Sequence, residues 1–61
     1  MSHKIIITKF DGSTSEETFD NATAMLARSI AVKPGAVKDC DTRMVTNWKQ
    51  DDNGDWVRYS E

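Results

Sequence analysis

The chain has 61 residues, of which 38% are hydrophobic and 30% charged, and its formal net charge is −2 at pH 7. This balance is typical of a folded globular chain and argues against intrinsic disorder and against a basic nucleic-acid-binding arm. A chain this short forms a single domain, residues 1–61, and buries only about 60% of its unfolded surface, which leaves little room for a deep active site.

The domain must hold together by packing alone, because Cys40 is the only cysteine and no intramolecular disulfide can form. A reducing compartment is the simplest setting for such a chain. The apolar run at residues 5–7 is too short for a signal sequence or a membrane span. We therefore expect a cytoplasmic protein with no membrane partner.

The first strand is predicted at residues 4–10, which are rich in β-branched and aromatic side chains and precede the turn signal Asp11-Gly12. Side chains alternate between the two faces of a strand. One side therefore carries Ile6, Thr8 and Phe10, and the other carries Ile5, Ile7 and Lys9. Apolar residues on both sides indicate a central strand.

A second, weaker strand is predicted at residues 13–19. Its polar composition is typical of a sheet edge, where charge discourages stray pairing. A two-residue turn before it would place Phe19 on the same side of the sheet as Ile6 and Phe10.

A helix is predicted at residues 22–32, with Asp20 or Asn21 as the capping residue and with Pro34 and Gly35 ending it. The face expected to meet the sheet carries Ala22, Met25, Leu26, Ser29 and Ile30. A helix of about three turns depends on docking this face for its stability.

A second hairpin is predicted at residues 43–60, because Asn53-Gly54 separates two runs of alternating character. A two-residue loop places Trp48 opposite Tyr59, and a four-residue loop places it opposite Val57. Both loops give the same core-facing side, which carries Met44, Trp48, Val57 and Tyr59. The other side then carries Arg43, Val45, Asn47, Lys49, Trp56 and Arg58.

The fold class that follows is α+β, a small antiparallel sheet of two β-hairpins with one helix between them packed on one face. This β-β-α-β-β plan, together with the small size and the acidity, resembles the small proteins of bacteriophages and mobile elements that bind and inhibit or redirect a host protein. The resemblance covers the whole chain loosely and implies a binding function without catalysis.

The residue that stands out for function is Trp56, which the predicted register places on the polar side of the hairpin. Lys49 or Arg58 could stack over its ring as a cation–π pair. Exposed aromatic and arginine side chains are typical of binding hot spots. The candidate partner-binding residues are Trp56, Arg58, Lys49, Arg43 and Val45. The alternative is that the connection at residues 34–42 or basic side-chain stems cover Trp56.

The loop of this hairpin forms an acidic tip, Asp51, Asp52 and Asp55. It lacks the glycine and glutamate that an EF-hand has at fixed positions. The preference of Asp, Asn and Gly for turns explains this composition better, and we expect no metal.

No catalytic motif is visible. Cys40 lies between Asp39 and Asp41, and these like charges should disfavour its thiolate. There is no phosphate-binding glycine loop and no nucleophile elbow. We expect no enzyme activity, no cofactor and no small-molecule substrate.

Two functional hypotheses remain. The first is a non-catalytic protein-binding module that binds a larger protein or a second copy of itself. The second is a single-stranded nucleic-acid binder in which Trp56 stacks on bases and its basic neighbours contact phosphates. The acidic net charge ranks nucleic acid second.

Overall fold

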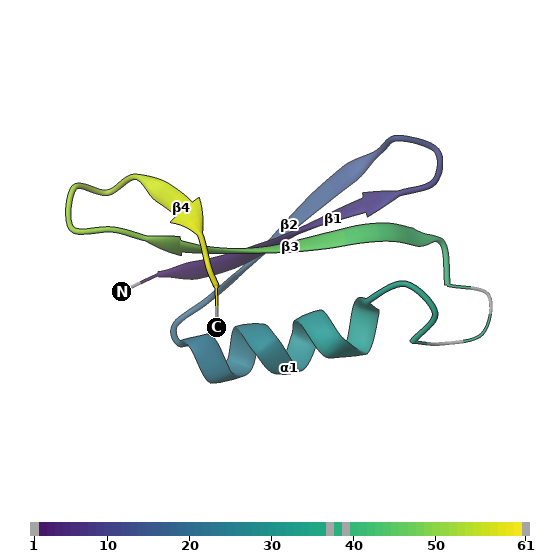
Figure 1. Cartoon of the computed structure of the whole chain (residues 1–61), viewed down its shortest axis with the longest axis horizontal. Coiled ribbons are helices and arrows are strands. Elements are labelled where there is room, and N and C mark those ends of the chain that lie inside the picture. Colours follow the sequence, from purple (N-terminus) through teal and green to yellow (C-terminus); the bar gives the residue numbers. More distant parts are fainter. Residues whose placement is uncertain (1, 37, 39, 61) are drawn as a thin grey trace.

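The computed structural model describes residues 2–36, 38 and 40–60, and shows an antiparallel sheet with one helix packed against one face (Figure 1). The elements in chain order are β1 (His3–Lys9), β2 (Thr14–Phe19), α1 (Ala22–Val32), β3 (Thr42–Gln50) and β4 (Trp56–Arg58). The sheet order is β2-β1-β3-β4, so the two hairpins join through their first strands. The predicted α+β class with a helix between two hairpins is confirmed.

The first hairpin closes with a three-residue loop, not the two-residue loop expected. The backbone N–H of Lys9 donates to the carbonyl oxygen of Ser13 over 2.9 Å, and that of Gly12 donates to the carbonyl of Lys9 over 3.0 Å. Gly12 has a φ of 89°. A type I turn followed by a left-handed glycine is the usual geometry of a three-residue hairpin loop.

The second hairpin repeats this loop. The N–H of Asp51 donates to the carbonyl of Asp55 over 2.8 Å, and the N–H of Gly54 donates to the carbonyl of Asp51 over 3.0 Å. Gly54 has a φ of 86°. In both loops the glycine therefore occupies the last of three positions, after an Asp or an Asn.

The odd loop length corrects the predicted faces, because a shift of one residue turns every side chain of a strand to the other side. Phe19 pairs with His3 and so lies on the side of Ile5, not with Ile6 and Phe10. Trp48 pairs with Arg58 instead of Tyr59 or Val57.

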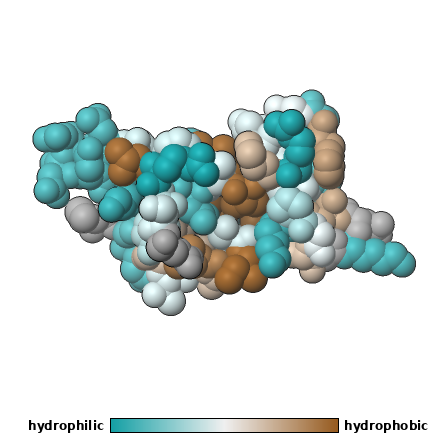
Figure 2. Space-filling view, viewed as in Figure 1, coloured by the Kyte–Doolittle hydropathy of each residue, from teal (hydrophilic) through white to brown (hydrophobic). Residues whose placement is uncertain are grey.

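The hydrophobic core lies between the sheet and α1. Its buried residues are Ile5, Ile7 and Met25, with at most 7% of each exposed. Half-buried side chains surround them: Phe19, Ala22, Leu26, Val32, Val45 and Tyr59. Figure 2 shows hydrophobic surface where β3 passes over α1. Phe10, by contrast, is 70% exposed at the tip of the first hairpin, which corrects its expected place on an apolar face.

The helix begins and docks through polar contacts as well as apolar ones. Asn21, not Asp20, caps it, because the Oδ1 atom of Asn21 accepts the N–H of Ala24 over 2.8 Å. Arg28 donates to both carboxylate oxygens of Glu17 on β2, over 2.9 and 3.3 Å. No helix in the described residues is long and apolar enough to cross a membrane.

Candidate partner-binding site

One face of the sheet lies opposite α1, and the register identifies the side chains on it. Residues that pair across an antiparallel ladder share a face, and residues two apart along a strand do so too. The open face, as we call it, comprises Lys4, Ile6, Thr8, Thr14, Glu16, Thr18, Met44, Thr46, Trp48, Gln50, Trp56 and Arg58. Both tryptophans of the chain are among them.

Trp48 lies on the inner strand β3, two residues before that strand ends. It pairs with Lys4 on β1 and with Arg58 on β4, so a cation flanks it on each side. Its indole Nε1–H donates to the hydroxyl of Thr46 over 2.9 Å. This bond satisfies the indole donor and leaves the ring as a half-buried apolar group on the face.

Each tryptophan ring of the open face has a cation over it. The Lys4 Nζ atom lies 4.5 Å from the centroid of the Trp56 ring. The Arg58 Cζ atom lies 5.3 Å from that of Trp48. Such contacts are attractive within about 6 Å because the face of an aromatic ring carries negative partial charge. The cation–π contact expected for Trp56 exists, but its cation comes from β1 and not from the hairpin.

Lys4 is also held by Glu16, the acidic residue of the open face, whose Oε1 lies 3.1 Å from the Lys4 Nζ. The lysine side chain is only 14% exposed, whereas that of Glu16 is 56% exposed. The remaining apolar surface comes from Ile6, which is half-buried, and Met44, which is 44% exposed. Of the charged side chains on this face, Glu16 and Arg58 therefore lie on the two outer strands, and the mostly buried Lys4 lies on the middle strand β1.

The structure brings together only part of the predicted site. Trp56 and Arg58 share the open face. Val45 pairs with Ile7 and packs into the core, and Lys49 pairs with His3 on the helix side. Arg43 is exposed at the point where the pairing of β1 with β3 shifts register.

Of the open face, sequence reasoning placed only Trp56 and Arg58 in the candidate site and missed the other members, among them Lys4, Ile6, Met44 and Trp48. The loop Asp52-Asn53-Gly54 decides the face of Met44 and Trp48, because asparagine followed by glycine suits a three-residue loop as well as a two-residue one. With the three-residue loop, Trp48 moves from the predicted core side to the face of Trp56. Lys4 and Ile6 depend instead on the pairing of β1 with β3.

The acidic tip includes a side chain that stabilises the loop by hydrogen bonds. The carboxylate Oδ1 of Asp51 accepts the backbone N–H groups of Asn53 and Asp55, both over 2.9 Å. Gln50 adds a side-chain bond to the carbonyl of Gly54 over 2.9 Å. Figure 2 shows this end of the molecule as hydrophilic surface. Within the described part of the chain, no three His, Cys, Asp or Glu side chains are grouped to hold a metal ion.

Cys40 has an environment different from the expected one. Hydrogen bonds from the hydroxyl and the backbone of Thr42 lower the pKa of the Cys40 thiol, and they outweigh the opposing charge of Asp41. The expected effect of Asp41 on the thiolate is therefore present but outweighed, so the net direction of the pKa shift is opposite to the prediction, and Asp39 lies outside the described residues. The thiol also lies 3.9 Å from the carbonyl oxygen of Val32, at the end of α1.

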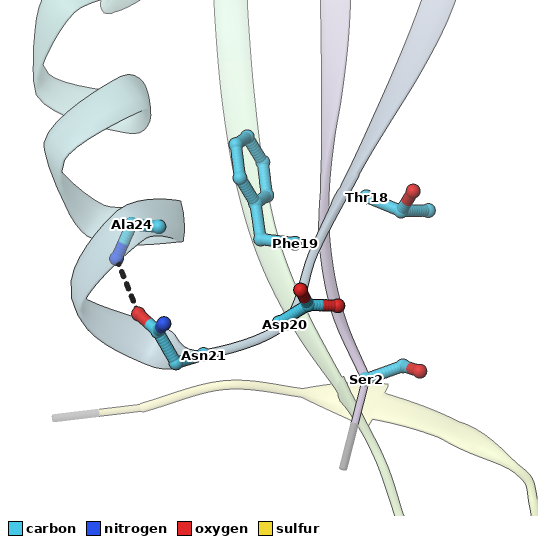
Figure 3. A pocket seen from close by; sticks show the side chains of 6 residues that line it. All are labelled: Ser2, Thr18, Phe19, Asp20, Asn21 and Ala24. Atoms are coloured by element: carbon cyan, nitrogen blue, oxygen red, sulfur yellow. Dashed lines mark hydrogen bonds between the residues drawn. The ribbon is translucent and has the colours of Figure 1, made fainter.

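A hollow of about 360 Å³ lies at the junction of β2 and α1. Its lining residues are Ser2, Thr18, Phe19, Asp20, Asn21 and Ala24, as Figure 3 shows. The Asn21 side chain is already engaged in capping the helix. Among the described residues, the lining of the hollow thus offers two hydroxyls and one carboxylate, without a cation, thiol or imidazole.

Neither the protein families, nor the curated proteins, nor the solved structures compared with this chain give a match.

Proposed function

We propose that this protein is a small non-catalytic protein-binding module that binds a partner protein through the open face. It acts as a regulator or inhibitor of a larger protein, of the kind encoded by bacteriophages and mobile elements. The observation that carries the proposal is that Trp48 and Trp56 share a sheet face opposite the helix, and that Met44, 44% exposed, lies on the same face farther along β3.

The composition of this face supports a protein partner. Tryptophan and arginine dominate binding hot spots, and methionine is enriched at interfaces. Lys4 and Arg58 already lie over the two indole rings, so the aromatic groups are held in place before binding. A preformed surface loses less conformational entropy on association than a flexible one.

The test is capture of the partner from the source cell with three immobilised proteins: the wild type and the Trp56→Ala and Met44→Glu variants. Proteins identified by mass spectrometry should bind the wild type and be lost with both variants. Phe10→Ala is the matched control, because Phe10 is an exposed aromatic at the tip of the opposite hairpin. Circular dichroism establishes that each variant is folded.

Met44→Glu keeps the test decisive if Trp56→Ala unfolds, since Met44 is exposed enough to accept a polar side chain. Capture that persists with a folded Met44→Glu variant would contradict the proposal. Equal loss with Phe10→Ala would show that the capture does not depend on the open face.

A second candidate function is binding of single-stranded nucleic acid. The observation in its favour is the arrangement of two tryptophans with Lys4 and Arg58 on an open antiparallel sheet, because such sheets stack bases on aromatic rings while cations contact phosphates. Glu16 on the same face and the net charge of −2 oppose it. Oligonucleotide titration at low salt should then quench tryptophan fluorescence, and quenching should weaken steeply as salt rises.

A further inference from the structure

We propose that a second copy of this chain covers the open face, so that two sheets pack face to face about a two-fold axis parallel to their strands. The inference rests on the proposed function in one respect, namely that the open face binds protein. It names the occupant and the orientation, which the proposed function leaves open.

The open face carries opposite charges on its two outer strands. Glu16 lies on β2 and Arg58 on β4, which are the two outer strands of the sheet. Among the described residues, the salt bridges join Lys4 to Glu16, Lys9 to Asp41 and Arg28 to Glu17. Arg58 takes part in none of them and is exposed. The face thus carries an acid at one edge and, at the other, a cation that lies over the Trp48 ring but has no carboxylate partner among the described residues.

This pattern selects one orientation of the two copies. Packed sheets keep their strands aligned within about 30°. A two-fold axis parallel to the strands lays β2 of one copy over β4 of the other, so Glu16 faces Arg58 of the second copy twice. An axis across the strands would lay β2 over β2 and bring the two Glu16 carboxylates together. Like charges in contact are repulsive, which disfavours the second orientation.

The pairing is within reach of the side chains. Along the strand direction, Glu16 lies at the same level as its pairing partner Ile6. Arg58 lies at the level of Lys4, because both pair with Trp48. These levels are two residues apart, or roughly 7 Å along a strand. An arginine and a glutamate side chain together span that offset and the sheet separation of about 10 Å.

The centre of the interface is complementary in the same orientation. The middle strands β1 and β3 lie over each other, so Ile6 and Trp48 enter the interface from both copies. Lys4 and Trp48 share one level, so each Lys4 lies against Trp48 of the second copy. The Lys4 charge keeps its Glu16 partner, which means that no unpaired charge is buried there.

The size of the face sets the strength of the dimer. Four strands about 4.8 Å apart and about 20 Å long give a footprint on the order of 400 Å² per copy. Stable interfaces bury about 800 Å² per partner. The dimer is therefore weak and reversible, and a larger partner with a better fit can displace the second copy.

The test is analytical ultracentrifugation from about 10 μM to about 1 mM, the range in which a weak complex forms. The wild type should shift from monomer towards dimer as concentration rises. Glu16→Arg and Arg58→Glu should each be monomeric over the same range. An equimolar mixture of these two variants should dimerise again, because each interface site then holds one acid and one cation.

Lys49→Glu is the matched control, because Lys49 carries the same charge change on the neighbouring strand but faces the helix side. It should leave dimerisation unchanged. A wild type that stays monomeric to about 1 mM would overturn the inference, while partner capture through the open face would still stand. A dimer that survives Arg58→Glu, or a variant mixture that stays monomeric, would overturn the orientation.

Discussion

The ammonium group of Lys4 lies 4.5 Å from the centroid of the Trp56 ring, although the two residues are in the first and last strands of the chain. The contact spans β3, because β1 and β4 do not pair with each other. Lys4 therefore joins the two hairpins on the open face, in addition to the hydrogen bonds of the sheet.

Replacing Lys4 with methionine should lower the free energy of unfolding by about 1 kcal/mol, because the side chain keeps its apolar stem but loses its cation–π contact and its carboxylate partner. Urea unfolding followed by tryptophan fluorescence measures the change. Lys33→Met is the control, since Lys33 is exposed beyond the end of α1. A Lys4→Met variant as stable as the wild type would show that the contact contributes nothing to folding.

Gly54→Ala should lower the free energy of unfolding by about 1–2 kcal/mol, the cost of a left-handed conformation for an L-residue. The φ of Gly54 is 86°. A Cβ there would meet the Gln50 side chain at an ordinary 3.8 Å, so the cost is conformational and not steric. Gly54→Asn should be milder, since asparagine tolerates this region. Equal stability of the alanine variant and the wild type would contradict the loop geometry.

The same loops explain how far the sequence predicts this fold. Strand-forming composition, the Asn21 cap and the stop at Pro34 locate all five elements, since these signals are local. The register of each hairpin changes instead when its loop is one residue longer or shorter. The sequence does not fix that length, because two-residue and three-residue loops both use glycine after Asp or Asn. The predicted existence of each hairpin was therefore right, as were the faces of β1 and β4, but β2 and β3 were paired one residue off and their side chains were assigned to the wrong faces.

The candidate site was predictable only in part for the same reason. Trp56 and Arg58 are two apart on β4, so any register keeps them on one face. Whether Trp48 joins them depends on the loop, and whether Lys4 does depends on the pairing of β1 with β3. That pairing joins distant segments, and no local signal in the sequence specifies it.

The stability of the protein in acid should depend on Asp11. The Oδ1 atom of Asp11 accepts the hydroxyl of Ser13 over 2.6 Å and its N–H over 2.8 Å, and these bonds lower the pKa of Asp11. A carboxyl whose pKa is lower in the folded state stabilises the fold above its unfolded pKa of about 4. That contribution is lost as the pH falls through the folded value.

Ser13→Ala should therefore be less stable than the wild type at neutral pH, with the difference shrinking below pH of about 4. Urea unfolding across this pH range gives the difference, and an NMR titration of the Asp11 carboxyl should show its pKa rising towards the ordinary value in the variant. A stability difference that is constant with pH would contradict the role of the Asp11 charge.

The reactivity of Cys40 should depend on Thr42, whose hydroxyl and backbone lower the pKa of the thiol. Thr42→Val keeps the shape of this buried side chain but removes the hydroxyl. The pH profile of alkylation by iodoacetamide should shift to higher pH in the variant, because the thiolate is the reactive form. Thr42→Ser, which keeps the hydroxyl, serves as the control. Identical profiles for the wild type and Thr42→Val would rule out this role of the hydroxyl.

Asn47 offers a way to stabilise the protein. Its side chain enters the helix side of the sheet beside Ile5, and its Oδ1 atom is buried with no hydrogen-bond partner among the described residues. A buried acceptor that lacks a partner costs about 1–3 kcal/mol. Asn47→Leu has nearly the same shape and should raise the free energy of unfolding by about 1 kcal/mol, whereas Asn47→Asp should lower it by burying a charge. Urea unfolding of both variants measures the effect.

The backbone carbonyl of Asn47, which accepts the N–H of Tyr59 over 2.9 Å, is unchanged in either variant. A leucine variant less stable than the wild type would therefore mean that the side-chain oxygen has a stabilising partner.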